Sequence, residues 1–201
     1  MAEEFDVIVI GGGAAGENVA GRVQDGGLSA VVIESDLIGG ECSYWACMPS
    51  KALLRPGEAL AVARRVPSIR DAVTGGIDVE KALSSRNAFA SNWDDSGQEQ
   101  WLASVNAELI RGHGKITGEK AVTAFEKDGT ARELVARKAV VVATGSTSFI
   151  PPIDGLDGAE AWDSRKIVTS PTVPERLLIL GGGVVGIEMA QAWNSLGSDV
   201  T

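Results

Sequence analysis

Short apolar runs along the chain alternate with glycine-rich turns and with stretches compatible with helices. Residues 7–10, 30–33, 138–144 and 177–180 are mostly apolar and lack the polar alternation of a half-exposed strand. This pattern is typical of strands buried on both faces of a parallel sheet. The chain is therefore predicted to have an α/β fold.

Two regions between these runs have a helical character. We expect a helix over residues 51–65, closed by Pro67, and a mainly helical region over residues 78–110. Asp95 and Ser96, followed by polar residues, are a reasonable helix start. In the second region, the plausible buried positions are Phe89, Trp93, Trp101, Leu102, Val105 and Leu109.

Turn residues mark the rest of the chain. Residues 115–137 predict a small antiparallel hairpin that turns at Asp128–Gly129. Residues 145–176 carry four of the seven prolines, which suits a segment that crosses between two domains.

The chain also contains a weak internal repeat. Residues 7–20 (VIVIGGGAAGENVA) align with residues 177–190 (LLILGGGVVGIEMA), and each reads as a strand, a glycine-rich turn and the start of a helix. Two such units imply two dinucleotide-binding folds, or one such fold and the beginning of a second. We place the domains at residues 1–150 and 151–201.

Composition and charge narrow the function. The 18 basic and 27 acidic residues among 201 give a formal net charge of −9, which argues against nucleic-acid binding. No apolar stretch approaches the roughly 20 residues of a membrane span, and the N-terminus is acidic where a secretory signal is basic. We therefore expect a cytoplasmic protein without membrane contact, in which a disulfide is more often catalytic than structural.

The first glycine turn satisfies the pattern G-x-G-x-x-G at Gly11, Gly13 and Gly16. In such a turn, the first glycine permits the tight bend, the second admits a pyrophosphate, and the third lets the helix pack on the strand. The free N–H groups of the helix N-terminus favour an anion. Glu34 ends the next apolar run, 23 residues after Gly11, where a carboxylate can accept hydrogen bonds from an adenosine ribose. A solvated charge at a strand end is the alternative.

The only two cysteines, Cys42 and Cys47, lie close together just after this turn. In a regular helix their Cα atoms would be roughly 8–9 Å apart, whereas a disulfide needs about 4.4–6.8 Å. A bond between them therefore requires a loop or a distorted helix start, for which Pro49 gives a reason. Cys47 would then lie near a helix N-terminus, where a thiolate is stabilised. A redox pair, a structural staple and two inert thiols all remain open, whereas a metal site lacks ligands.

The ordered motifs GGGAAG, GGECSYWACMPSK, VVATGS and GGGVVGIE resemble those of the class I pyridine nucleotide-disulfide oxidoreductases, which include dihydrolipoyl dehydrogenase, glutathione reductase and mercuric reductase. The resemblance covers the whole chain, and the cysteine motif looks most like the dihydrolipoyl dehydrogenase and mercuric reductase branches. It implies a Rossmann-like FAD-binding domain with a small antiparallel β-meander, followed by the start of a Rossmann-like NAD(P)-binding domain. It also implies a flavoenzyme that moves electrons between NAD or NADP, FAD, the cysteine pair and a small-molecule disulfide or dithiol.

The resemblance also implies roles for individual residues. Cys47 would be the thiol nearest the flavin, able to form a charge-transfer complex with it, and Cys42 would be the interchange thiol that attacks the substrate. Lys51 would place its ammonium near the flavin, paired with the carboxylate of Glu188, although both could be plain surface charges. The implied cofactor contacts are Gly11, Gly13, Ala14, Ala15, Gly16, Glu34, Ser35, Gly40, Glu41, Cys42, Cys47, Lys51, Gly114, Ala143, Thr144 and Gly145 for FAD, and Gly181, Gly183 and Gly186 for NAD(P).

The motif departs from the family between the cysteines. Glu41 stands where threonine is usual, and Tyr44 and Trp45 are bulkier than the usual residues. Packing is the simpler role for both aromatic residues, and substrate contact is the alternative. These departures leave the substrate open.

In the first glycine turn, Glu34 follows Gly11 by 23 residues. The same offset from Gly181 gives residue 204, which would separate NADH from NADPH but lies beyond Thr201, the last residue of the sequence. Family members are more than twice as long, form homodimers, and carry a catalytic His–Glu pair in the later part. His113, the only histidine, does not match that base, and we expect it in a loop or partly packed. We expect the 201-residue chain alone to hold FAD poorly and to be inactive. The alternatives are a flavin NAD(P)H oxidase or quinone reductase with idle cysteines, and a non-catalytic nucleotide-binding fragment.

Overall fold

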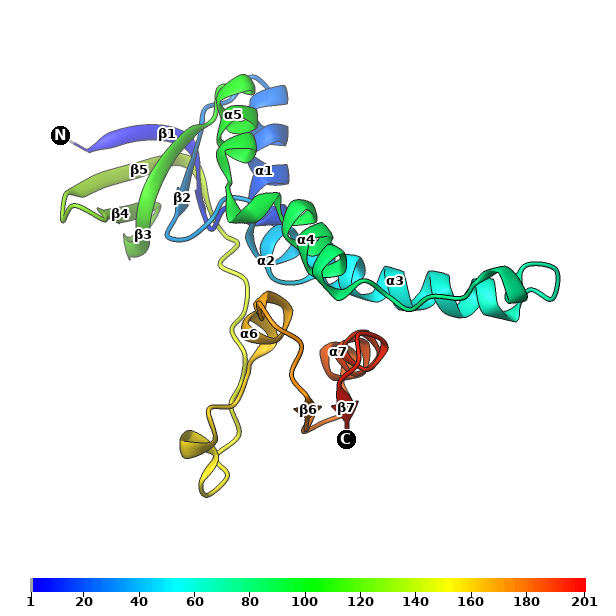
Figure 1. Ribbon diagram of the computed structural model, residues 1–201. Coiled ribbons are helices and arrows are strands. Elements are labelled where there is room, and N and C mark those ends of the chain that lie inside the picture. The colour runs from blue at the N-terminus through cyan, green and yellow to red at the C-terminus, as the bar shows by residue number, and fades with distance from the viewer. Residues whose placement is uncertain (1) are drawn as a thin grey trace. The chain divides into compact units, whose positions relative to one another are not determined.

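The computed structural model describes residues 2–201, the side chain of Asp157 excepted, and divides the chain into two compact units (Figure 1). The first unit runs up to Cys42 and resumes over Trp93–Thr147, and the second comprises Ser43–Asn92 and Ser148–Thr201. These units interleave along the sequence. The assignment of residues 1–150 to an FAD domain and 151–201 to an NAD(P) domain stays a prediction.

The first unit is a closed sheet of five strands with two helices against it. The strands are β1 (Glu3–Ile10), β2 (Ala30–Glu34), β3 (Glu108–Gly118), β4 (Ala121–Glu126) and β5 (Ala131–Val142), and the helices are α1 (Ala14–Asp25) and α5 (Ser96–Ser104). β1 pairs in parallel with β2 and β5, and β2 pairs in parallel with β3. β4 pairs antiparallel with β3 and β5, so a parallel sheet and an antiparallel meander share the two long strands.

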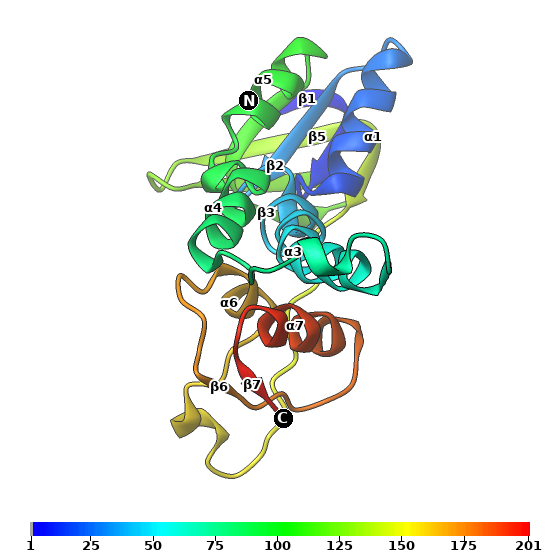
Figure 2. The ribbon, with the colours of Figure 1, turned by 45° about the vertical axis from the view of Figure 1, so that its right-hand side comes forward.

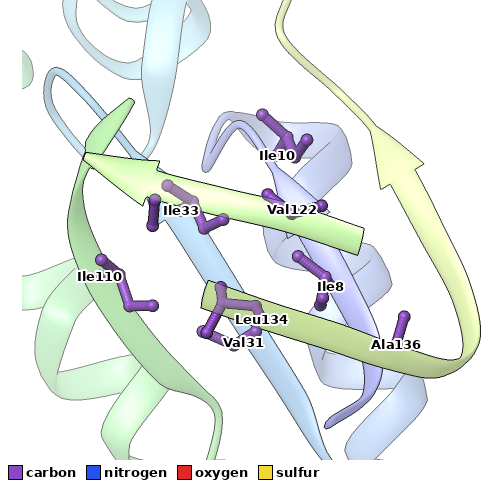
Figure 3. Close-up of a cluster of buried hydrophobic side chains, with 9 residues drawn as sticks. Ile8, Ile10, Val31, Ile33, Ile110, Val122, Leu134 and Ala136 are labelled. Atoms are coloured by element: carbon purple, nitrogen blue, oxygen red, sulfur yellow. The ribbon is translucent and has the colours of Figure 1, made fainter. Parts of the chain in front are cut away.

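Alternate residues of β1 and β2 enter two different cores, which confirms that both runs are buried on both faces. Ile8 and Ile10 point into the interior of the closed sheet with Val31 and Ile33 (Figure 3). Val7, Val9 and Val32 face the other way, where the core includes Ala20 of α1 and Leu102 of α5.

The hairpin is confirmed, and its turn follows the expected chemistry. β4 ends at Glu126 and β5 begins at Ala131. Between them Gly129 has a φ of +91°, and Asp128 accepts a hydrogen bond from the Thr130 N–H at 2.8 Å. The helix start at Asp95–Ser96 is also confirmed, since α5 begins at Ser96.

The second unit is mainly helical. Its helices are α3 (Cys47–Arg65), α4 (Val79–Phe89), α6 (Ser164–Thr169) and α7 (Val184–Ser195), with a small parallel sheet of β6 (Arg176–Leu177) and β7 (Asp199–Val200). Short 3₁₀ turns lie at Arg70–Ala72, Ser91–Trp93 and Leu156–Ala159, and α2 (Gly40–Tyr44) spans the unit boundary. Figure 2 shows α3, α6 and α7 from a second direction. Their core includes Leu53 of α3, Ile167 of α6, and Met189 and Trp193 of α7.

Several expectations about the burial of individual residues and strands were wrong. Phe89 and Trp101 are 57% and 41% exposed rather than buried, and Trp101 lies over Gly21 of α1, whose Cβ position is 3.2 Å from the Trp101 ring. Strand β6 includes only Leu177 of the run at residues 177–180, although the Ile179 N–H donates to the Thr201 carbonyl at 2.8 Å, and Leu178 and Leu180 are 79% and 72% exposed rather than buried.

A further correction concerns β5, and helix α3 is longer than residues 51–65 alone. The run at residues 138–144 forms the end of β5 but is only partly buried: Val140 and Val141 are half-buried against the two cores, and Val142 is 62% exposed. The helix expected over residues 51–65 begins earlier, at Cys47, and continues through Pro56. Pro49 lies in the first turn of α3, where proline is tolerated, whereas Pro56 lies within the helix and lacks the N–H that would bond to the preceding turn.

Among residues 2–201, no helix combines the length and the apolar character that a membrane span requires.

Candidate functional site

The first glycine turn packs against two other segments that the sequence singled out. Gly11 has a φ of +103°, and a Cβ there would lie 2.2 Å from the carbonyl oxygen of Ala143. Gly40, with a φ of +61°, lies so close that its Cβ would be 2.7 Å from the Gly13 Cα. Three motifs that are distant in sequence therefore meet at one place, and only glycine fits two of the contact points.

The third glycine confirms its predicted packing role. A Cβ at Gly16 would lie 1.9 Å from the carbonyl oxygen of Gly11 and 3.3 Å from a methyl group of Val9. Helix α1 can therefore approach β1 only because residue 16 has no side chain.

The N-terminus of α1 has the properties of an anion site. Gly13 is the N-cap and provides no side-chain cap, and Ala14 and Ala15 are exposed. The first N–H groups of the helix therefore have no side-chain acceptor and face solvent, where a pyrophosphate would complement them. Glu17, which the sequence analysis missed, lies in this first turn, and burial raises its pKa.

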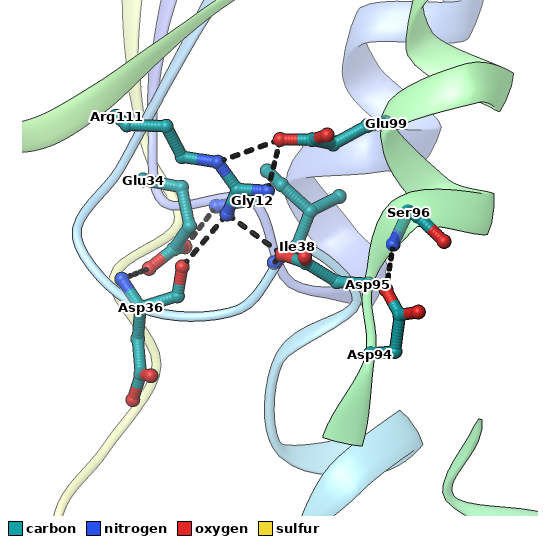
Figure 4. Close-up of polar contacts among 9 residues, drawn as sticks. All are labelled: Gly12, Glu34, Asp36, Ile38, Asp94, Asp95, Ser96, Glu99 and Arg111. Carbon is teal, nitrogen blue, oxygen red and sulfur yellow. Dashed lines mark hydrogen bonds and ion pairs between the residues drawn. The ribbon is translucent and has the colours of Figure 1, made fainter. Parts of the chain in front are cut away.

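Glu34 lies beside the same turn, at the end of β2. Its Oε2 accepts a hydrogen bond from the Gly12 N–H at 2.6 Å, and its Oε1 accepts one from the Asp36 N–H at 2.7 Å (Figure 4). Each carboxylate oxygen keeps acceptor capacity beyond these bonds. The carboxylate thus lies where a ribose beside the glycine turn would reach it, and its ribose role and that of the neighbouring Ser35 stay predictions.

An ionic network that the sequence did not reveal holds the loop after Glu34 (Figure 4). Arg111 of β3 makes an ion pair with Asp95 at 2.7 Å, another with Glu99, and donates to the Asp36 carbonyl at 2.9 Å. Asp95 also accepts the Ile38 N–H at 2.8 Å. Burial raises the pKa of Asp95, but hydrogen bonds from Arg111 and Ile38 outweigh it and hold that pKa below its usual value.

This network predicts a specific pH dependence. A carboxyl with a lowered folded-state pKa stabilises the fold above its unfolded pKa of about 3.9 and loses that contribution as the pH falls through the folded value. We expect Arg111→Gln to lower the free energy of unfolding by about 2 kcal/mol at pH 7, since it removes charged hydrogen bonds from a mostly buried carboxylate. The penalty should shrink at pH 3, as measured by urea unfolding.

The exposed Arg55–Glu58 pair provides the control for this experiment. Arg55→Gln should change the free energy of unfolding by only a few tenths of a kcal/mol at either pH, because an exposed ion pair usually contributes about 0–1 kcal/mol. An Arg111→Gln penalty of equal size at both pH values would contradict the role given to Asp95.

The remaining predicted flavin contacts are placed as follows. Gly114 lies in β3, with its Cβ position 3.0 Å from a methyl group of Ile10, so packing against β1 explains the glycine. Ala143 follows β5 and its N–H donates to the Ile10 carbonyl at 2.7 Å, Thr144 continues the chain, and Gly145 has a φ of +70°. Their contacts with FAD stay predictions.

His113 does not lie where it was expected. It forms part of β3, opposite Phe125 of β4, and its side chain is exposed rather than in a loop or partly packed. Side chains alternate across a strand, so the residues flanking Gly114 point away from the interior that Gly114 faces.

The two cysteines lie on successive helices. Cys42 is in the middle of α2 and half-buried, and Cys47 is the first residue of α3 and exposed. The prediction that Cys47 lies at a helix N-terminus is confirmed, with Pro49 in the first turn of α3. Glu41 is the second residue of α2, next to Cys42. Their redox role stays a prediction.

Lys51 and Glu188 form the ion pair that the resemblance implied. Lys51 Nζ lies 2.5 Å and 2.6 Å from the two carboxylate oxygens of Glu188, across the seam between α3 and α7 in the second unit. Lys51 is one helical turn after Cys47. The side chain of Lys51 is 60% exposed and that of Glu188 is 29% exposed, so the role of the pair beside a flavin stays a prediction.

A close approach of the same two helices accompanies this pair. A Cβ at Gly57 of α3 would lie 2.5 Å from both Cβ and Oγ of Ser195 of α7. An open groove of about 730 Å³ follows the seam, and its lining includes Lys51, Gly57, Glu188 and Ser195. Gly57 thus sets how closely α3 and α7 pack along the seam.

We expect Gly57→Ala to destabilise the protein although alanine is the better helix former. Alanine usually gains about 1 kcal/mol over glycine within a helix, but the overlap with Ser195 should cost more, for a net loss of about 1–2 kcal/mol. Adding Ser195→Gly should recover most of that loss in urea unfolding. If Gly57→Ala instead stabilised the protein, α3 and α7 would be able to move apart at this contact without cost.

The second glycine turn has the geometry of the first. Gly181 has a φ of +107°, as Gly11 has +103°, and Gly183 is the N-cap of α7, as Gly13 is of α1. A Cβ at Gly186 would lie 2.8 Å from the Gly181 carbonyl oxygen. The internal repeat is thus present in the backbone, and the NAD(P) contacts of these glycines stay predictions.

Comparison with known proteins identifies the family. The family described as "Pyridine nucleotide-disulphide oxidoreductase" matches residues 5–201. The chain belongs to this family. Among curated members, the dihydrolipoyl dehydrogenases of Chlorobaculum tepidum and Bacillus subtilis are 34% and 30% identical over the whole chain, which covers 43% and 44% of their lengths. A mercuric reductase of Lysinibacillus sphaericus is 28% identical over 99% of the chain, which covers 36% of that enzyme.

The fold agrees with the family assignment. The chain superposes on the flavoprotein disulfide reductase RclA from Escherichia coli with a TM-score of 0.83 and 24% sequence identity. The superposition includes all of this chain and 42% of RclA. The chain thus spans about two fifths of the length of the relatives it matches.

Proposed function

We propose that this chain carries the flavin site and the redox-active cysteine pair of an NAD(P)H-dependent disulfide oxidoreductase. The Lys51–Glu188 ion pair is the main support. These two side chains are 137 positions apart, and they meet one helical turn from Cys47 in the way that the family motifs imply.

The residues of the first unit fit FAD. The glycine turn, the exposed N-terminus of α1 and the carboxylate of Glu34 would hold the pyrophosphate and the adenosine ribose. When bound, FAD supplies the transfer of an electron pair between the nicotinamide and the cysteine pair. Gly181, Gly183 and the N-terminus of α7 would in turn hold the pyrophosphate of NAD or NADP.

The chemistry of the cysteine pair follows from thiol–disulfide exchange. The Cys42 thiolate attacks one sulfur of a substrate R–S–S–R, forms a mixed disulfide and releases RS⁻, which takes up a proton. Cys47 then attacks the Cys42 sulfur, closes the Cys42–Cys47 disulfide and releases the second thiol. NAD(P)H returns the pair to dithiol, so the net reaction is NAD(P)H + H⁺ + RSSR → NAD(P)⁺ + 2 RSH. We propose a small disulfide or dithiol as the substrate and a homodimer as the working form.

An acceptor panel tests this function on the flavin-loaded protein, in the longest form that its gene encodes. NADH and NADPH oxidation is measured with lipoamide, glutathione disulfide and Hg²⁺, and with menadione or O₂ as acceptors that need no thiols. With at least one disulfide or thiol-bound acceptor, we expect NAD(P)H oxidation to be about tenfold or more faster than with O₂. A tenfold difference in rate corresponds to roughly 1.4 kcal/mol in the activation free energy. Oxidation supported only by menadione and O₂ would favour a quinone reductase or oxidase with idle cysteines.

A further inference from the structure

The residues between the two cysteines are held by an aromatic stack. Tyr44 is completely buried, and its ring meets that of Trp45 edge-on, with centroids 5.7 Å apart and planes at 61°. Trp45 is half-buried and packs against the core of the second unit. The predicted packing role is thus confirmed for both side chains.

A cation covers the Trp45 ring. The guanidinium carbon of Arg165, from α6, lies 3.8 Å from the centroid of that ring. Contacts at this distance are cation–π interactions, and their strength grows when solvent is partly excluded.

Helix α6 is itself fixed in the second unit. Ile167 and Val168 are buried in its core. The buried guanidinium of Arg86, from α4, donates to the carbonyls of Val168 at 2.7 Å and Ser170 at 2.9 Å, at the end of α6. Arg165 therefore extends from a rigid support to the segment that separates the two cysteines.

We propose that Arg165 is a positioning residue for the redox pair: its stack on Trp45 holds the segment between Cys42 and Cys47 in one conformation and so favours closure of their disulfide. This inference rests on the proposed function, in which the two cysteines form that bond. Closing the ring requires ordering of the four intervening residues, and a segment ordered in advance has less entropy to lose. The stack thus raises the effective concentration of one sulfur at the other.

The reaction that reports this effect needs no flavin. In a glutathione buffer, the two thiols lose two electrons and two protons to one glutathione disulfide, which gives the Cys42–Cys47 disulfide and two glutathione molecules. The equilibrium constant of this exchange is measured on the 201-residue chain by acid quenching, alkylation and mass spectrometry of the peptide with both cysteines.

Three variants and one control test the stack. We expect Arg165→Met and Trp45→Leu each to lower the equilibrium constant roughly three- to tenfold, the scale of a partly desolvated cation–π contact. Because both act through one contact, the double variant should be no worse than either single variant. Arg55→Met removes an exposed cation of the same unit, one that pairs with Glu58, and should leave the constant unchanged. Urea unfolding verifies that each variant is folded. If Trp45→Leu does not fold, the comparison of the equilibrium constants of Arg165→Met and Arg55→Met decides the question alone.

The outcomes separate this inference from the proposed function. Equal constants for the wild type and Arg165→Met, or effects of Arg165→Met and Trp45→Leu that add in the double variant, would overturn the positioning role and leave the redox pair standing. A wild-type chain that forms no Cys42–Cys47 disulfide at any glutathione ratio would overturn both.

Discussion

Replacing either cysteine by serine is expected to abolish disulfide reduction by the flavin-loaded protein. In the proposed mechanism, Cys42 attacks the substrate and Cys47 resolves the mixed disulfide, so neither step has a substitute. We expect kcat with the best disulfide acceptor to fall by about 10³-fold or more for Cys42→Ser and for Cys47→Ser, the scale of a lost nucleophile. Both variants should fold, since Cys47 is exposed and Cys42 is only half-buried.

The acceptor panel supplies the internal control for this result. Oxidation of NADH or NADPH with menadione should persist in both variants, because that reaction does not use the thiols. In Cys47→Ser the mixed disulfide on Cys42 should accumulate and be visible by mass spectrometry, whereas Cys42→Ser should form none. Full disulfide turnover in both variants would contradict the mechanism.

Gly11→Ala is expected to have the largest effect on folding. The residue combines a φ of +103°, which alanine rarely adopts, with a Cβ position 2.2 Å from the Ala143 carbonyl oxygen. Strain of this kind costs about 1–3 kcal/mol and overpacking about 1–3 kcal/mol more, so we expect a loss of roughly 3–5 kcal/mol in the free energy of unfolding. Urea unfolding measures it, and a protein that no longer folds is the upper limit of the same expectation.

Two other glycines separate the causes. Gly129 has a φ of +91° but open space around it, and Gly97 has open space without a positive φ. Gly129→Ala should therefore show the backbone strain alone, about 1–3 kcal/mol, and Gly97→Ala, within α5, should be neutral or stabilising by up to about 1 kcal/mol. If Gly11→Ala cost no more than Gly129→Ala, the close contact between the glycine turn and the Ala143 carbonyl would be contradicted.

Sequence reasoning succeeded where the backbone leaves few choices. The glycine turns, the strands of β1 and β2 and the hairpin at Gly129 follow from positive φ angles and from apolar runs without alternation. The Lys51–Glu188 pair was reached by a different route, since only the motif resemblance connected two charges 137 residues apart. Nothing in local periodicity would have joined them.

The failures share a physical cause, which is that they depend on tertiary packing. Arg111, Asp95 and Glu99 form a network through folding, whereas the sequence indicates only a helix start at Asp95 and does not connect it with Arg111. Trp101 was expected in the core but covers Gly21, a surface that exists only once α1 and α5 are packed. Likewise, Gly57 in a helix reads as a defect until Ser195 is seen against it.

The redox pair itself is tested most directly by counting thiols. One equivalent of NADH or NADPH is added without oxygen to the oxidised, flavin-loaded protein, and thiols are then alkylated in denaturant and mapped by mass spectrometry. Our account predicts two new thiols per chain, both on the peptide that contains Cys42 and Cys47. A reduced flavin with no new thiols on that peptide would contradict it.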